Sequence, residues 1–253
     1  MSEQSPAVAG ARRRLRGRRY LTALVLTAVA GFVDIFAYLA LYRVFVANMS
    51  GDSIYVGLQT AKHDWVQVFH RGLPVAAFVG GLLACSVVVE MAKRHAVRQM
   101  LALTLMVEAL CLVAFLAFGA RLLGGLPRPV SQPSSDTAAL VALAAFAMGI
   151  QNASLRAAGV LNVYTTHVTG TLTRMAQRFV QFIFSLRGHS GSALRHPRLH
   201  QAINLAGLWV AYVLGAAAGG WSWLDVGFVA VWAPIGAIAI TGIVAFLSPA
   251  PLP

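Results

Sequence analysis

The sequence is poor in charged residues. Only 8 of its 253 residues are aspartate or glutamate, and charged residues make up 11% of the chain, against roughly 25% in an average soluble domain. Hydrophobic residues make up 58%, and the mean hydropathy is +0.71. This composition excludes a disordered chain and a water-exposed enzyme, and it predicts an integral membrane protein.

Several chemistries lack their usual sequence signatures. The two cysteines, Cys85 and Cys111, have no metal-ligand spacing and suit apolar packing. The chain has no GxxxxGK phosphate loop, no GxGxxG fingerprint and no HExxH pair. We therefore expect no catalytic residues, no metal and no cofactor, and ATP-driven transport by this chain alone is disfavoured.

Six apolar runs are long enough to cross a bilayer, which takes about 20 residues. They cover 20–41, 72–92, 98–119, 137–158, 200–220 and 226–247. A basic arm (1–19) precedes them, a loop (120–136) separates the third run from the fourth, and a short tail (248–253) follows. Because cytoplasmic segments are rich in arginine and lysine, we expect the arm and both termini to be cytoplasmic. The first run is too long for a signal-peptide core, so we expect it to be retained.

The two halves of the sequence, 20–119 and 137–247, repeat the same motifs. GFVD at 31–34 is echoed by GIQN at 149–152, and VFVANMSG at 44–51 by VYTTHVTG at 163–170. Each half also has a ladder of small residues, Gly72, Ala76, Gly80 and Ala84 in the first and Gly207, Ala211, Gly215 and Gly219 in the second. An odd number of runs separates the copies. We therefore predict an all-α membrane protein of six transmembrane helices, arranged as two inverted three-helix repeats, the plan of many secondary transporters. The alternative is a duplication kept only for packing.

Each half carries an extra segment with helical periodicity after its first span. Its apolar positions are Ile54, Leu58, Ala61, Trp65 and Phe69 in the first half, and Leu172, Met175, Ala176, Phe179 and Ile183 in the second. Ser50-Gly51 and Thr169-Gly170 are typical of helix starts, with a hydroxyl to cap free amides. Two interpretations remain open: broken membrane helices whose amides bind an anion, or interfacial helices that bind no ligand.

Polar residues near these motifs are the candidates for binding a substrate or ion. They are Asp34, Asn48, Ser50, Gly51, Asp52, Asn152, His167, Thr169, Gly170 and Thr171. Because a carboxylate inside an apolar span is costly, Asp34 and Glu108 are the candidates for proton coupling. The alternative for both is a structural hydrogen bond to a neighbouring span. His167 suits either a titrating gate or a satisfied turn, and Pro234 predicts a kink within the sixth span.

The motifs GFVD and FVANMSGDS, together with TTHVTGTLT, resemble the YoaK-like family of bacterial membrane proteins, whose function is unknown. The resemblance covers almost the whole chain beyond the basic arm, and it implies a polytopic protein of the inner membrane. Matching positions are Gly31, Asp34, Ser50, Gly51, Thr165, Thr166, Thr169, Gly170 and Thr173. Family members commonly have asparagine in place of Asp52 and an aromatic residue in place of His167. The resemblance implies no substrate.

The leading hypothesis is a secondary transporter or carrier for a small anionic or zwitterionic solute. Its expected partners are the lipid bilayer and that solute, without nucleic acid, and a homo-oligomer is left open. The first alternative is a non-catalytic membrane protein whose basic arm binds anionic lipid or a partner. The second is an intramembrane enzyme built on Ser50 and a histidine, although Ala47-Asn48-Met49 lacks the glycine of a GxSG element.

Overall fold

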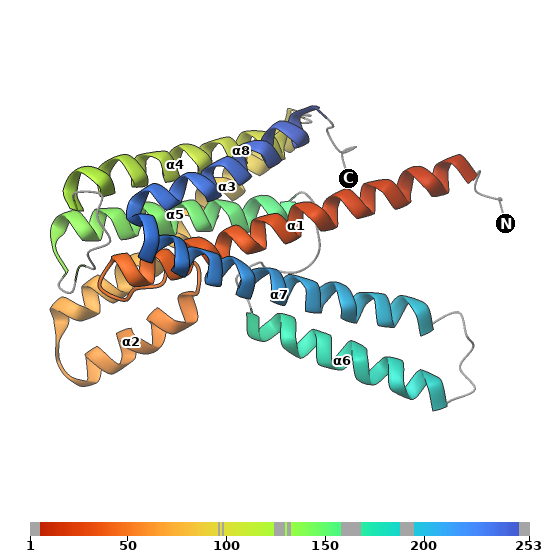
Figure 1. Cartoon of the computed structure of the whole chain (residues 1–253), viewed down its shortest axis with the longest axis horizontal. Helices are drawn as coiled ribbons and strands as arrows, with labels where there is room; N and C mark the ends of the chain where they lie inside the picture. The colour runs from red at the N-terminus through yellow and green to blue at the C-terminus, as the bar shows by residue number, and fades with distance from the viewer. Residues whose placement is uncertain are drawn as a thin grey trace.

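The computed structural model describes residues 6–95, 97, 99–123, 130, 133–157, 168–187 and 195–247. The regular secondary structure of the described residues is helical, and one isolated bridge joins Leu41 and Val130. Its helices are α1 (Pro6–Ala40), α2 (Met49–Ala61), α3 (Trp65–Arg94), α4 (Met100–Leu123), α5 (Ser135–Ala157), α6 (Val168–Arg187), α7 (Arg195–Val226), the 3₁₀ helix η2 (Gly227–Val231) and α8 (Trp232–Leu247) (Figure 1).

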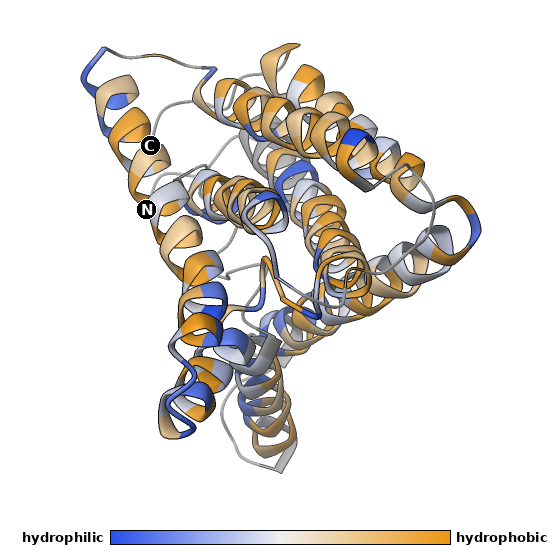
Figure 2. Cartoon of the chain, turned by 90° about the vertical axis from the view of Figure 1, so that its left-hand side faces the viewer, coloured by the Kyte–Doolittle hydropathy of each residue, from blue (hydrophilic) through white to orange (hydrophobic). Residues whose placement is uncertain are grey.

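Five described segments are long and apolar enough to cross a membrane. They are Gly17–Ala40, Trp65–Arg94, Met100–Leu122, Ser135–Arg156 and Pro197–Leu247. The last of these holds α7, η2 and α8, and α7 and α8 run in opposite directions (Figure 1). Large apolar side chains on the outer helices are exposed, among them Leu83, Leu110, Leu214 and Ile240, and hydrophobic residues colour most of the helical ribbon (Figure 2). Apolar exposure on this scale marks a surface that faces lipid.

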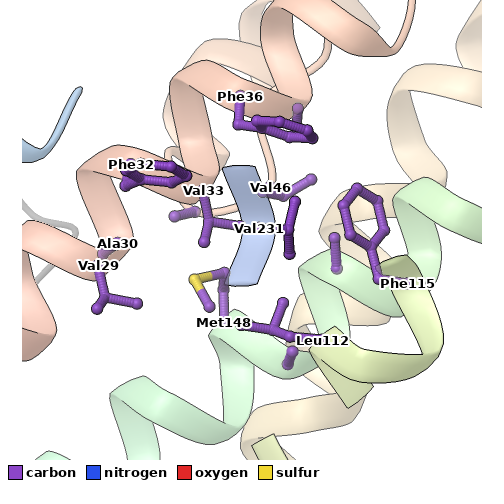
Figure 3. Close-up of a cluster of buried hydrophobic side chains, with 14 of the residues drawn as sticks. Val29, Ala30, Phe32, Val33, Phe36, Val46, Leu112, Phe115, Met148 and Val231 are labelled. Carbon is purple, nitrogen blue, oxygen red and sulfur yellow. The ribbon is translucent and has the colours of Figure 1, made fainter. Parts of the chain in front are cut away.

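Helices α1 and α5 form the centre of the bundle. The most apolar stretch of α1 is 67% buried and that of α5 is 78% buried, against 28% for α3 and 39% for α4. Side chains from both central helices enter one core, which includes Phe36 from α1 and Met148 from α5 (Figure 3). The Phe36 ring makes edge contacts with Phe115 of α4 and Phe228 of η2. The polar groups described below therefore lie within an apolar, closely packed interior.

Two close helix crossings hold the bundle together, and glycines make both possible. In the α1–α7 crossing, a Cβ atom on Gly31 would overlap the carbonyl oxygen of Tyr212. In the α5–α3 crossing, a Cβ atom on Gly149 would overlap the carbonyl oxygen of Phe78. Gly31 and Gly149 are the first residues of the repeated motifs GFVD and GIQN. Small residues of this kind let the backbones of membrane helices approach each other directly.

The second ladder of small residues meets its crossing as predicted, whereas the first meets its crossing one residue away from the predicted register. Gly215 contacts the backbone of Ala28 in the α1–α7 crossing, and Gly81 contacts the backbone of Phe146 in the α5–α3 crossing. The prediction that Gly80 is the counterpart of Gly215 is therefore wrong, because Gly80 meets only the ring of Phe146 at an ordinary 3.8 Å. Adjacent residues point about 100° apart on a helix. In a Gly-Gly pair the sequence leaves open which of the two faces the neighbour.

The extra segments form α2 and α6, which pack on α3 and α7 respectively. Both begin near the middle of the view in Figure 1 and diverge toward opposite ends. The predicted apolar stripe from Ile54 to Phe69 does not lie on a single helix. His63 has φ 56°, and Asp64 then caps α3 by accepting a hydrogen bond from the Gln67 amide at 3.1 Å. A left-handed residue ends α2, and a capped α3 starts immediately after it.

Several helix ends differ from the predicted bounds. Helix α1 begins at Pro6, so the described part of the expected arm (1–19) is helical. Helix α3 begins at Trp65 rather than at residue 72. Pro234 lies in the first turn of α8, directly after η2. Because proline is tolerated at a helix start, where its missing N–H has no partner to lose, α8 follows a 3₁₀ entry and Pro234 does not interrupt an α-helix as predicted.

Candidate functional site

The carboxylate of Asp34 joins three separate parts of the fold. Its Oδ1 accepts hydrogen bonds from the backbone amides of Val46 and Ala47 at 2.8 Å each, and from that of Asn48 at 3.3 Å. Its Oδ2 accepts a hydrogen bond from the hydroxyl of Tyr212 at 2.6 Å. Asp34 is 2% exposed. One side chain of α1 thus holds both the segment that leads into α2 and the middle of α7.

This arrangement differs from the predicted capping of α2. The N-cap of α2 is Asn48, which makes no side-chain capping bond, and Ser50 Oγ donates to Asn48 Oδ1 at 2.8 Å. The amides just ahead of α2 are bound by Asp34, a carboxylate from another helix. Among the ion pairs of the described residues, none involves Asp34. Its charge is stabilised by four directed donors instead of by a cation, since bonds to an ionised acceptor are strong.

A second carboxylate, Asp52, lies in the first turn of α2 and is completely buried. Its Oδ1 is 3.6 Å from Nη1 of Arg71 on α3. The guanidinium donates its hydrogen bonds elsewhere, to the backbone carbonyls of Arg43 and Tyr42, and it lies 4.6 Å from the centre of the Tyr55 ring. The Arg71 guanidinium and the backbone of Phe45 lie close enough to lower the pKa of Asp52, but among the described residues neither Asp52 oxygen has a partner in hydrogen-bond geometry.

The turn between α1 and α2 explains why Arg71 is held in this way. Tyr42 and Arg43 both have left-handed backbone angles, with φ 25° and φ 56°. Such angles are costly for residues other than glycine and are retained where surrounding contacts enforce them. Here the amide of Tyr42 donates to the carbonyl of Val130 at 2.7 Å, and the carbonyls of Tyr42 and Arg43 bind Arg71.

Burial changes the acidity of this region. Burial raises the pKa of Asp52 to about 7; the positive charge of Arg71 opposes this rise, and the negative charge of Asp34 adds to it. Burial likewise raises the pKa of Tyr42 to about 12. Asp52 therefore changes charge close to neutral pH, whereas the Tyr42 hydroxyl stays protonated there.

Tyr42, Asp52, His70 and Arg71 form what we call the junction cluster, at the meeting point of α1, α2 and α3. The rings of Tyr42 and His70 are 6.0 Å apart. Tyr42 Oη, His70 Nδ1 and Arg71 Nε are buried and, like both oxygens of Asp52, have no hydrogen-bond partner within the described part of the chain. Buried polar groups in proteins are nearly always satisfied, by water or a ligand where the protein supplies no partner. The cluster offers acceptors on Asp52 and donors on Arg71 and Tyr42.

The repeated motif of the second half has an amide where the first half has the Asp34 carboxylate. Asn152, in the repeated motif, takes the position of Asp34, and its Nδ2 donates to the carbonyl of Met148 on its own helix at 2.9 Å. Phe78 takes the position of Tyr212 in the equivalent crossing. At these two positions the α5–α3 crossing therefore has an amide and a phenyl ring where the α1–α7 crossing has a carboxylate paired with a phenol.

The remaining predicted residues that the structure describes divide into two groups. Asn48, Ser50, Gly51 and Asp52 lie beside Asp34 at the start of α2, where Gly51 packs against the ring of Phe45. Thr169, Gly170 and Thr171 lie at the start of α6, and no hydrogen bond or ion pair among the described residues connects them to Asp34. Thr165, Thr166 and His167 lie outside the described residues.

Glu108 forms a separate buried contact between α4 and α5. Its Oε1 accepts a hydrogen bond from Nε2 of Gln151 at 2.8 Å, and both side chains are completely buried. Sequence reasoning missed Gln151, as it missed Tyr212, Tyr42, His70 and Arg71. Gln151 lies inside the repeated GIQN motif, and Arg71 directly precedes the first glycine of a ladder, so both had a local signal. Tyr212 had none beyond its position next to Ala211 of the second ladder.

The fold and its buried polar groups define a multi-pass α-helical membrane protein, and the comparisons with known proteins agree. The chain belongs to the family described as "Protein of unknown function (DUF1275)", which matches residues 22–244. It is similar to the UPF0700 transmembrane protein YoaK of Bacillus subtilis (strain 168), with 29% identity over 153 residues. That alignment covers 60% of this chain and 64% of the relative. No solved structure matches the chain.

Proposed function

We propose that the protein is a secondary carrier for a small zwitterionic or anionic solute in the bacterial inner membrane. In this proposal the chain crosses the membrane six times as two inverted repeats, α1–α4 and α5–α8, with both termini in the cytoplasm. The arginine-rich first turns of α1 support that orientation.

The packing of the helices supports the inverted repeat. The first helix of each half crosses the third helix of the other half, so α1 packs on α7 and α5 packs on α3. Equivalent glycines, Gly31 and Gly149, make the closest contacts of the two crossings. Helices α2 and α6 take equivalent places beside α3 and α7. In transporters of this plan, the binding groups lie where the two repeats meet.

The observation that carries the proposal is the position of Asp34. Its carboxylate holds the non-helical segment 41–48 of its own half and the Tyr212 hydroxyl of the other half. Non-helical backbone at membrane depth is tolerated where it is buried in protein or lines a cavity. A proton on Asp34 would remove the negative charge that these donors stabilise, which would weaken both attachments together. Asp34 is thus suited to couple a proton to relative movement of the two halves.

The junction cluster supplies groups that suit the solute. An ammonium group would donate to the unsatisfied oxygens of Asp52, while an anionic group would accept from Arg71 Nε and Tyr42 Oη. A zwitterion satisfies both sets of atoms. An anion without an ammonium group would bind when Asp52 is protonated, which its pKa of about 7 allows near neutral pH.

Ligand-dependent stability tests this proposal without a guess at the solute. The purified protein is heated with a library of zwitterionic, anionic, cationic and neutral metabolites, about one pH unit below and above the Asp52 pKa. A ligand at 100 times its dissociation constant adds about 2.7 kcal/mol of stability. We expect stabilisation by one zwitterionic or anionic class, and its loss in Asp52→Asn and Arg71→Gln. Asp64→Asn, which changes the exposed cap of α3, is the matched control and should keep the response.

Uptake of the stabilising compound into proteoliposomes is the second step. Asp34→Asn should insert and fold but lose proton-driven uptake. The proposal is overturned if no compound class stabilises the protein. It is also overturned if both Asp52→Asn and Arg71→Gln bind the stabilising compound as tightly as the parent protein does. Stabilisation by anionic lipid alone would favour the non-catalytic lipid-binding alternative.

A further inference from the structure

The contact between Glu108 and Gln151 leaves two buried atoms without partners. Glu108 Oε1 accepts a hydrogen bond from Gln151 Nε2 at 2.8 Å. This bond gives one partner to the carboxyl group of Glu108 and one to the carboxamide of Gln151. On the other side, Glu108 Oε2 and Gln151 Oε1 both lack a hydrogen-bond partner among the described residues. Both of these oxygens are acceptors when the glutamate is ionised. A carboxylate and a carboxamide held in this way are therefore short of one donor.

Within the described part of the chain, no charge near Glu108 compensates a buried carboxylate. Helix α4 packs on α5, α8, η2 and, more slightly, α3. Helix α8 and η2 contain no charged residue, and the charged residues of α5 and α3 lie toward the ends of those helices. The titratable groups that interact electrostatically with Glu108 are the thiols Cys85 and Cys111. An isolated carboxylate is strongly disfavoured in such surroundings, and a buried carboxyl group of this kind takes up a proton instead.

A single proton on Glu108 Oε2 supplies the missing donor. The O–H group then donates toward Gln151 Oε1 while Gln151 Nε2 donates to Glu108 Oε1, which closes a ring of two hydrogen bonds between a carboxylic acid and a primary amide. Both atoms without partners are satisfied, and no net charge is buried. We propose that Glu108 is held as a neutral carboxylic acid by Gln151, so that the pair is a proton-binding site between α4 and α5.

The pair differs in kind from the Asp34 site. Among the described residues, the Asp34 carboxylate accepts hydrogen bonds from four donors and has no acceptor beside it, which favours its ionised form. Glu108 accepts one hydrogen bond, and its partner Gln151 has an oxygen without a donor, which favours the protonated form of Glu108. The first half would then hold both kinds of buried carboxyl group, a charged one on α1 and a neutral one on α4. The presence of the proton does not depend on the proposed carrier function; only its use in coupling does.

Infrared spectroscopy of the purified protein, without any solute, tests the proposal. A protonated carboxyl group has a C=O stretching band that is separate from the carboxylate bands and shifts in D₂O. We expect Glu108→Gln to lose one such band and Glu90→Gln, which changes an exposed carboxyl near the end of α3, to keep it. The measurement is independent of ligand binding, so its failure and that of the carrier proposal are distinguishable.

Thermal stability distinguishes a neutral carboxylic acid at position 108 from an ionised one. Glu108→Gln should retain the thermal stability of the parent, because its amide N–H takes the place of the acid O–H in the ring. Gln151→Leu should lose stability, because it removes both partners of Glu108. The proposal is overturned if Glu108→Gln leaves the carboxyl band unchanged, or if sodium or potassium ions abolish that band in the parent protein, which would assign the space to a metal cation.

Discussion

Tyr212 Oη and Asp34 Oδ2 are 2.6 Å apart, although 178 positions separate the two residues in the sequence. This hydrogen bond connects α1 of the first half with α7 of the second, beside the crossing that Gly31 makes possible. The same carboxylate binds the segment that precedes α2. Any change in the protonation of Asp34 therefore acts on the contact between the halves and on the entry to α2 at the same time.

Removing the Tyr212 hydroxyl should weaken the α1–α7 contact. A hydrogen bond to a charged group contributes about 1.5–3 kcal/mol, so Tyr212→Phe should lower the free energy of unfolding by about 2 kcal/mol, measured by thermal or denaturant unfolding in detergent. Tyr20→Phe is the matched control, because the Tyr20 hydroxyl bonds the neutral carbonyl of Asn204 between the same two helices. An equal loss in both variants would show that the charge on Asp34 contributes nothing.

Neutralising Asp34 should loosen the segment ahead of α2. Asp34→Asn keeps the size of the side chain but removes the negative charge that three amides bind. Hydrogen exchange at Val46 and Ala47 should accelerate by about tenfold or more, since bonds to ionised acceptors are about twice as strong as neutral ones. Asp64→Asn should leave this exchange unchanged. Unaltered protection in Asp34→Asn would mean that the segment is held by its other contacts.

Alanine in place of the crossing glycines should be severely destabilising. A Cβ at Gly31 or Gly149 overlaps a backbone carbonyl oxygen, which has no rotamer to adopt. Overpacking of this kind typically costs about 1–3 kcal/mol, and the cost here should be at or above about 3 kcal/mol. Gly17→Ala and Gly236→Ala are the controls, because a Cβ at either position meets nothing within 4 Å. Alanine there should stabilise its helix by up to about 1 kcal/mol. Tolerance of Gly31→Ala would refute the close crossing.

Stability should depend on pH through Asp52. The ordinary pKa of an aspartate is 3.8, and that of Asp52 is about 7 in the folded protein, so between these values the folded state binds a proton that the unfolded state does not. Stability contributed by this group is therefore complete below about pH 4 and falls as pH rises toward 7, by up to about 1.4 kcal/mol per pH unit. Asp52→Asn should flatten that slope, and Asp64→Asn should not. A slope that is unchanged in Asp52→Asn would assign it to another group.

The candidate site was partly readable from the sequence. A carboxylate within an apolar run is expensive wherever the helix packs, so Asp34 and Glu108 were visible without a structure. The repeated motif that begins with Gly31 in one half and Gly149 in the other indicated the helix crossings, since only small residues allow helix backbones to touch. The composition alone indicated a helical membrane protein.

The partners of those residues came only from the tertiary structure. Tyr212, Arg71 and Gln151 are ordinary residues in their own segments, and they matter because the fold brings them to Asp34, Asp52 and Glu108. The choice between Gly80 and Gly81 also depended on the rotation of α3 against α5. Local sequence determines the cost of burying a group, which is a property of that group and its apolar surroundings. A hydrogen-bond donor or acceptor on another helix offsets that cost, and only the packing of the helices decides which residue supplies it.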